Sequence, residues 1–315
     1  MSITRADIEQ SFRKLLARAP GENAVKNNIG GDATDFITKI CLSPEFLDKF
    51  LRQFRLHVSS QMLPLEHERV VFLHIPKCGG TTLHDTLTSW YGKTMVHNER
   101  HNGLYFNSIA GLASKIVFSG HYDYYSTQLI PGHKRMISFL RDPKKRLISL
   151  YNFHRAHTEQ VINQQNLQLA RWANQYNIDE YFTRDEIRNH PAINNSMARY
   201  FSNIPQGIAL PKDSQFRNNN NLEAMTEQAL ANIMTFYFIG FIENYSQSIN
   251  TLAEKLGKIA PEKIEKKQVL KDLMNQNPNM RPIETQPPNN KTLSAMDDLV
   301  QSDYKVYELA KKTFS

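Results

Sequence analysis

Four short apolar runs form the most regular pattern in the chain. They are RVVFLHI (69–75), the stretch around Ile116–Phe118, RMISFL (135–140) and TFYFIGF (235–241). Nearly continuous apolar runs of this length are typical of strands buried on both faces of a sheet. Helical patterns follow at 82–92, 144–155 and 243–257. Strands that alternate with helices in this way predict an α/β fold with a parallel sheet.

The first part of the chain has a different, entirely helical pattern. One helical run at 8–20 stops at Pro20-Gly21, and an amphipathic one at 33–54 is broken at Ser43-Pro44. The residues of the second run that we expect to face a core are Phe36, Ile37, Ile40, Phe46 and Leu47. We therefore predict a small all-helical module at 1–62 and a separate α/β domain at 66–315.

The rest of that domain has less regular signals. Residues 158–235 are mainly polar and helical, and 277–291 are rich in Pro and Asn and are expected to be irregular. A helical pattern at 294–314 closes the chain.

Composition excludes several protein classes. With 40% hydrophobic residues in 315, the chain can build a core, which argues against global disorder. No run approaches the roughly 18 apolar residues of a membrane-spanning helix, and the opening MSITRADIEQSFRKLL lacks the apolar region of a secretory signal. Because the only cysteines are Cys41 and Cys78, a disulfide scaffold is excluded. We expect a cytoplasmic protein with no transmembrane segment.

The charge balance points to an anionic partner. Thirty-eight Lys and Arg against 31 Asp and Glu leave a net charge of +7. Seven basic residues and one acidic residue lie between Lys134 and Arg155, a local +6, so much of the excess is concentrated there. The rest of the excess positive charge is compatible with an acidic acceptor. Nucleic acid is not the expected partner, because no signature of stacking aromatics accompanies the basic run.

The segment PKCGGTT (76–82) stands between the first strand and its helix. Glycines let backbone N–H groups turn inward, and the start of the next helix adds its positive dipole end. Lys77 contributes a cation, and Thr81 and Thr82 contribute hydroxyls. A plain strand-to-helix turn is the alternative. The segment is not a Walker A loop, because its lysine precedes the glycines. Nor is Cys78 a phosphatase nucleophile, since His84 stands where that loop needs Arg.

A second candidate anion site follows the third strand. Arg141 comes directly after the strand, Pro143 suits the first turn of a helix, and Ser149 lies two turns further on. Ligands of open α/β sheets bind at the carboxyl ends of the strands. Two anion sites at one sheet edge predict a ligand with two separated phosphates, although a solvated basic helix face remains the alternative.

PKCGGTTL together with FLRDPKKRLISLYNF resembles the paired signatures of sulfotransferases that use 3′-phosphoadenosine-5′-phosphosulfate (PAPS). The similarity is to the carbohydrate branch that includes heparan sulfate 2-O- and 6-O-sulfotransferases and bacterial relatives, and it covers about 68–250. It implies a P-loop NTPase-like parallel sheet flanked by helices. FRKLLARAP and LSPEF, in the amino-terminal segment, are similar to a short helical module of bacterial proteins (DUF4214-like).

The resemblance also implies a cofactor and its ligands. PAPS is the expected sulfuryl donor, and adenosine 3′,5′-bisphosphate is the expected product. The expected partner is an acceptor with a hydroxyl group, on a glycan, and no metal is required. The residues expected to hold the 5′-phosphosulfate are Lys77, Cys78, Gly79, Gly80, Thr81 and Thr82. Arg141 and Ser149 are expected to hold the 3′-phosphate. Cys78 replaces the usual Thr or Ser, which removes one hydroxyl.

Sulfuryl transfer to an alcohol needs a base and a stabilised leaving group. The resemblance places the base at His121, in a GH pair after the second strand, and Lys77 at the transferred group. His84 is the second candidate for the base. His74 is expected in the core, and the pair His97-x3-His101 is a weak metal motif. Secondary candidates for the cofactor or acceptor are Asn195, Arg199, Tyr122, Asp123, Tyr124, Arg281 and Lys291.

Two other function classes remain open at this stage. A nucleotide-dependent kinase needs an acidic Mg²⁺ ligand at a strand end, for which Asp142 is the near candidate. A noncatalytic glycan- or anion-binding protein on the same fold would keep Arg141 and the loop but tolerate the loss of His121.

Overall fold

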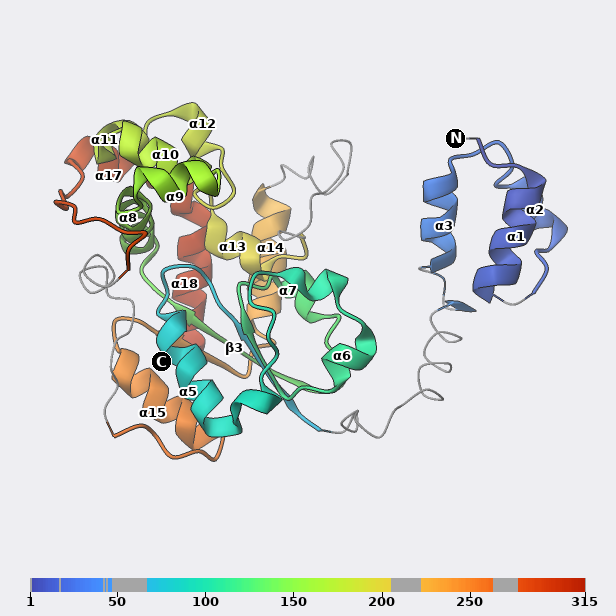
Figure 1. Ribbon diagram of the computed structural model, residues 1–315, viewed down its shortest axis with the longest axis horizontal. Coiled ribbons are helices and arrows are strands. Elements are labelled where there is room, and N and C mark those ends of the chain that lie inside the picture. The colour runs from blue at the N-terminus through green and yellow to red at the C-terminus, as the bar shows by residue number, and fades with distance from the viewer. Residues whose placement is uncertain are drawn as a thin grey trace. The chain divides into compact units, whose positions relative to one another are not determined.

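The computed structural model describes residues 2–16, 18–41, 43, 45–46, 67–204, 222–262 and 277–314. The chain divides into two compact units, Met1–Met62 and Leu63–Ser315, which Figure 1 shows as ribbons. In the described part of the chain, no helix combines the length and the apolar character needed to cross a membrane.

The described part of the first unit contains the helices α1 (Arg5–Leu16), α2 (Glu22–Lys26) and α3 (Ala33–Cys41). Their core consists of Ile3, Ile8, Phe12, Leu16, Val25, Phe36 and Ile40. Phe36 and Ile40 face this core as expected, because residues four apart share one face of a helix. The expectation for Ile37 is wrong: it is 37% exposed, since it lies about 100° further round α3. Phe46 packs against the cluster, and Leu47 lies outside the described residues.

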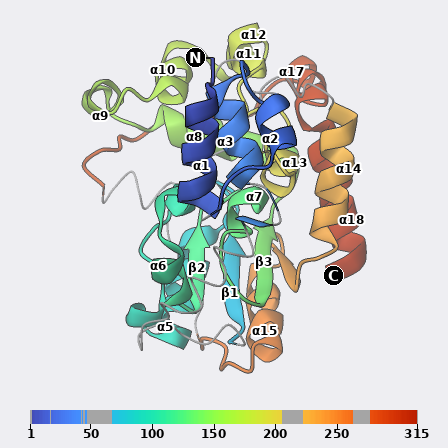
Figure 2. The same ribbon diagram turned by 90° about the vertical axis from the view of Figure 1, so that its right-hand side faces the viewer.

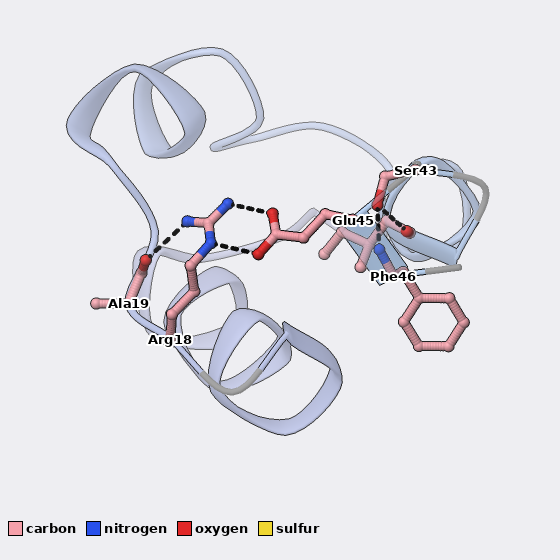
Figure 3. A network of polar contacts seen from close by, with 6 residues as sticks. Arg18, Ala19, Ser43, Glu45 and Phe46 are labelled. Atoms are coloured by element: carbon pink, nitrogen blue, oxygen red, sulfur yellow. Dashed lines mark hydrogen bonds and ion pairs between the residues drawn. The ribbon is translucent and has the colours of Figure 1, made fainter. Parts of the chain in front are cut away.

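A bidentate ion pair joins the segment after α1 to the segment after α3 (Figure 3). The Arg18 guanidinium donates from Nε and Nη2 to the two carboxylate oxygens of Glu45, at 2.7 and 2.6 Å, and from Nη1 to the carbonyl of Ala19. Beside it, the Ser43 hydroxyl accepts from the backbone N–H of Phe46 at 3.2 Å. The Arg18–Glu45 pair is exposed to solvent, so it orients the chain more than it stabilises it.

A parallel sheet of four strands, in the order β2-β1-β3-β4, forms the centre of the second unit. The strands are β1 (Arg69–Leu73), β2 (Val117–Gly120), β3 (Lys134–Leu140) and β4 (Phe238–Phe241). Three of them, β1, β2 and β4, are buried along their whole length, as strands covered on both faces must be. Figure 2 shows β2, β1 and β3 side by side in that order. The predicted α/β parallel fold is confirmed.

Helices cover both faces of the sheet. On one face, α5 (Gly80–Tyr91) and α15 (Tyr245–Lys255) pack against alternate strand residues such as Val70 and Phe72. On the other, α13 (Ser196–Phe201), α14 (Leu222–Ile233) and α18 (Gln301–Phe314) pack against the intervening ones, such as Val71 and Leu73. Figure 2 shows α14 and α18 running alongside each other. Because helices cover both faces, the strands are mostly apolar, although Ser119 and Ser138 are buried among them.

The second unit has further described helices. They are α6 (Ile109–Ala113), α7 (Tyr124–Thr127), α8 (Pro143–Arg155), α9 (Glu159–Gln164), α10 (Gln168–Gln175), α11 (Ile178–Tyr181), α12 (Asp185–Arg188) and α17 (Asn290–Ala295), with the 3₁₀ turns η1 (Lys93–Met95), η2 (Gly103–Phe106) and η3 (Asp298–Val300). A separate apolar cluster joins α8, α10 and α11 to η3. The closing helical pattern at 294–314 is interrupted in the structure, because α17 ends at Ala295 before α18 starts.

Candidate active site

A cavity of about 830 Å³ opens at the carboxyl ends of the strands. Its walls include His74 after β1, His121 after β2, Arg141 after β3 and Ile242 after β4. The cavity therefore lies where open α/β sheets bind their ligands. No Asp or Glu is among the described residues that line it, whereas Lys77 and three arginines are. Such a site attracts an anionic ligand.

The loop between β1 and α5 has the backbone shape of an anion cradle. Lys77 and Gly79 both have left-handed backbones, with φ of 71° and 70°. Gly79 caps α5 with no side-chain hydrogen bond to the helix N-terminus, so the positive end of α5 faces the cavity. A Cβ on Gly79 would lie 2.4 Å from Ile242, and Tyr245 donates its hydroxyl to the Gly79 carbonyl at 2.9 Å. Ile242, after β4, and Tyr245, in α15, therefore hold the loop in place.

Lys77 lies in the cavity with its amine against an aromatic ring. Its Nζ is 3.9 Å from the centroid of the Phe153 ring, a cation–π contact. Burial, reinforced by the nearby charge of Arg141, lowers the pKa of Lys77 to about 8. Gly79, Gly80, Thr81 and Thr82 line the same cavity, so the loop residues predicted for the phosphosulfate are brought together with Lys77.

Cys78 differs from its neighbours in the loop. Its side chain is fully buried in the core beneath the sheet edge, its N–H donates to the Ile75 carbonyl at 3.2 Å, and it does not line the cavity. Burial raises the pKa of its thiol to about 12, so the thiol stays protonated. The structure therefore places Cys78 below the predicted cofactor site, in contact with apolar side chains.

The second predicted anion site belongs to the same cavity. Asp142 caps α8 by accepting from the N–H of Lys145 at 2.9 Å, and Pro143 takes the first position of the helix. This start places Arg141 at the cavity and aims one face of α8 into it. Ser149 lies on that face. Arg141 and Ser149 both line the cavity together with the segment 76–82, which we call the phosphate loop after its predicted role.

His121 has one ring nitrogen fixed and one available. Its Nδ1 lies 2.8 Å from the backbone carbonyl of His74. Because a carbonyl only accepts, this bond assigns the hydrogen to Nδ1 and leaves Nε2 as an acceptor. Burial lowers the pKa of His121, so its neutral form prevails near neutrality. A neutral imidazole with a free Nε2 at a cavity wall has the properties of a general base.

The other candidate histidines differ in whether they line the cavity. His84 does not line the cavity; its Nδ1 is 3.0 Å from the Ser119 hydroxyl. His97 is buried against the Phe118 ring at 5.2 Å, while His101 lines the cavity. The pair lies in irregular chain and on no helix. The described residues contain no group of three or more His, Cys, Asp or Glu that could hold a metal ion.

His74 is buried as expected, but its ring also belongs to the cavity wall. Only 7% of the residue is exposed, and its ring stacks on His121 with centroids 4.2 Å apart. The expectation of a plain core histidine therefore needs correction. The strand pattern could not show this, because His74 follows the last paired residue of β1 and sits at the edge where the sheet meets the cavity.

Several cavity residues were not found from the sequence. They are Arg100, Arg146, Phe153, His154, His190 and Tyr200. Arg146 and Phe153 share the cavity-facing side of α8 with Ser149, so the spacing of three and four residues around Ser149 was a usable signal. Arg100 and His190 lie in irregular chain, where no periodicity indicates direction.

The secondary candidates lie elsewhere, and none of them lines the cavity. Asp123 caps α7 and accepts from the N–H of Ser126 at 2.7 Å, and Tyr122 is fully buried. Asn195 accepts from the N–H of Ser302 at 2.7 Å, which ties α13 to α18. The remaining members of this group are Tyr124, Arg199, Arg281 and Lys291. Asp142 is occupied as a helix cap and accepts from the Tyr304 hydroxyl at 3.2 Å, so it is not placed as a Mg²⁺ ligand.

Comparison with known proteins identifies the family of the chain. No curated protein matches the chain. The model of the "Sulfotransferase family" matches residues 60–310, well over half of the chain, and this range contains the sheet, the phosphate loop and the cavity. The parallel sheet with helices on both faces is consistent with a sulfotransferase fold. The chain therefore belongs to the sulfotransferase family.

Proposed function

We propose that the protein transfers a sulfuryl group from PAPS to a hydroxyl of a carbohydrate, with His121 as the base. The observation that carries this proposal is a cavity that combines the phosphate loop, Arg141 with Ser149, and the free Nε2 of His121, with no carboxylate among the described residues of its wall. When bound, PAPS supplies the sulfur atom that forms a bond to the acceptor oxygen while the bond to its phosphate oxygen breaks, which leaves adenosine 3′,5′-bisphosphate.

The cavity fits a nucleotide with two phosphate groups. The uncapped N-terminus of α5 and the amine of Lys77 suit the 5′-phosphosulfate. Arg141 suits the 3′-phosphate, because a guanidinium binds phosphate oxygens in pairs, and Ser149 adds a hydroxyl donor. A volume of about 830 Å³ falls within the range of small-molecule sites.

His121 removes the proton of the acceptor hydroxyl through Nε2. The Nδ1 hydrogen bond to the His74 carbonyl holds the neutral ring in the tautomer with a free Nε2, and it keeps the same ring orientation once Nε2 carries the proton. Lys77 stabilises the negative charge that develops on the leaving phosphate oxygen, as its protonated amine lies in a site shielded from water. Positioning and electrostatics then supply most of the rate, by analogy with phosphoryl transfer.

The acceptor is proposed to enter on the side of His121, where Arg100 and His101 also line the cavity. These two residues offer hydrogen-bond donors to sugar hydroxyls and to acidic substituents alike. A noncatalytic glycan-binding protein would use the same wall, so turnover is the property that separates the two functions.

Calorimetry tests the cofactor proposal. Adenosine 3′,5′-bisphosphate should bind the full chain at least about 10-fold more tightly than AMP, since the 3′-phosphate makes charge-assisted bonds worth roughly 1.5–3 kcal/mol. ATP, which lacks the 3′-phosphate, serves as the kinase control and should resemble AMP. Equal affinity for AMP and the bisphosphate would contradict the two-phosphate site. A screen of carbohydrate acceptors with ³⁵S-labelled PAPS then identifies the acceptor.

A further inference from the structure

The imidazole of His74 fills the space between His121 and the phosphate loop. Its ring stacks on His121 with centroids 4.2 Å apart and planes 26° apart. The ring also stacks on Phe72, with centroids 5.2 Å apart and planes 17° apart. Its edge rests on the first residue of α5, where a Cβ on Gly80 would lie 2.0 Å from both Cδ2 and Nε2 of His74. The ring is thus enclosed by β1, His121 and the loop.

The shape of the His74 ring contributes more to the packing of the site than its nitrogen atoms do. Its Nδ1 is buried with no hydrogen-bond partner in the described structure. Burial, followed by repulsion from His121, holds the pKa of His74 well below the ordinary value, so the ring is neutral at physiological pH. A buried polar atom without a partner is costly. An aromatic hydrocarbon would avoid that cost, and the position of the ring is the feature that the site exploits.

We propose that His74 is a positioning residue, whose ring acts as a spacer that sets the separation between His121 and the phosphate loop. The inference rests on the proposed function, in which His121 must reach the acceptor hydroxyl while the loop holds the sulfuryl donor. Transfer between two positioned groups is sensitive to their separation, and a displacement of about 1 Å costs roughly 100-fold in rate. Gly80 is required for the same reason, because any side chain there would displace the spacer.

The groups around His74 and His121 determine how the pKa of His121 responds when the His74 ring is replaced. The charged and titratable groups that act on them are Lys77, Arg100, His101 and His84. Burial is the largest cause of the lowered pKa of His121. A shorter or non-planar side chain at position 74 admits water beside His121 and lets its ring tilt, so the pKa of His121 should rise toward its ordinary value.

Two substitutions separate shape from chemistry. His74→Phe keeps a flat ring and removes both nitrogens, whereas His74→Leu keeps apolar volume and removes the flat ring. Nitrogen-15 spectra of the histidine side chains of the full chain, with His121 assigned from His121→Gln, give its tautomer and pKa without any turnover. His74→Phe should preserve both, and His74→Leu should raise the pKa and mix the tautomers. In labelled-sulfate assays, His74→Leu should lower kcat by roughly 100-fold with little change in KM for PAPS.

The outcomes decide the proposal. Equal kcat loss in both variants would show that the nitrogens matter and would overturn the spacer role, as would a His74→Leu variant with unchanged His121 spectra. Should His74→Leu fail to fold in thermal unfolding, Gly80→Ala displaces the ring while retaining His74 and should change the His121 spectra in the same direction. The spectra need no substrate, so they test the spacer role of His74 separately from the role of His121 as base. The two proposals can therefore fail independently.

Discussion

The amine of Lys77 lies 3.9 Å from the centroid of the Phe153 ring, with no carboxylate among the described residues of the cavity wall. A buried ammonium group in this setting has an aromatic face as its partner and lacks a counter-ion. The left-handed backbone of Lys77, which costs of order 1 kcal/mol or more, directs the side chain there. The site is therefore prepared for an anion that supplies the missing negative charge.

Affinity for adenosine 3′,5′-bisphosphate should fall as the pH rises through about 8, where the pKa of Lys77 lies. Only the protonated amine attracts the phosphate, so binding near pH 8 takes up a proton, and the loss between pH 7 and 9 should reach about 10-fold. Calorimetry in two buffers with different ionisation enthalpies measures both effects. Lys77→Arg retains the charge and should bind without the proton uptake. Undiminished uptake in Lys77→Arg would contradict the assignment.

Arg141 and Ser149 should contribute selectively to the 3′-phosphate. Arg141→Ala should weaken binding of adenosine 3′,5′-bisphosphate by about 10- to 100-fold, and Ser149→Ala by about 5-fold, because the former removes charge-assisted bonds and the latter a neutral one. AMP binding should hardly change in either variant. The matched control is Lys145→Ala, which removes a positive charge from the exposed side of the same helix. Equal losses for AMP would assign Arg141 to a different part of the ligand.

Much of this site was predictable, because the residues concerned stand directly after strands. The apolar runs predicted β1 to β4, and carboxyl ends of parallel strands meet at one edge, so Lys77, His121 and Arg141 had to approach each other. The direction of Cys78 was not predictable, since its left-handed neighbours break the alternation of side chains. His154 and His190 were missed because tertiary packing alone brings them to the cavity.

The stability of the protein should depend on pH through His154, which lines the cavity and is only partly exposed. Burial lowers the pKa of His154 to about 3. The unfolded chain binds this proton near the ordinary value of about 6.5, so the contribution of neutral His154 is complete above that pH and is lost as the pH falls. Between pH 7 and 5, His154 should cost about 2 kcal/mol of unfolding free energy.

Urea denaturation of the wild type and of His154→Phe at both pH values measures this contribution. The variant should lose less stability on acidification than the wild type. His133→Gln, which changes an exposed histidine, is the control and should retain the wild-type pH dependence. Identical pH dependence in His154→Phe and the wild type would show that His154 is not buried in its neutral form.

The most direct measurement of the central claim is single-turnover transfer of ³⁵S-sulfate from PAPS to an acceptor found in the screen, by the wild type and by His121→Ala. The rate should fall by about 100-fold or more, in line with the contribution of a general base, while the affinity for adenosine 3′,5′-bisphosphate stays unchanged. His84→Ala, which removes a histidine outside the cavity, should retain the wild-type rate. The assignment of His121 as the base would be contradicted if His121→Ala transferred sulfate at the wild-type rate. It would also be contradicted if His84→Ala alone lost the transfer.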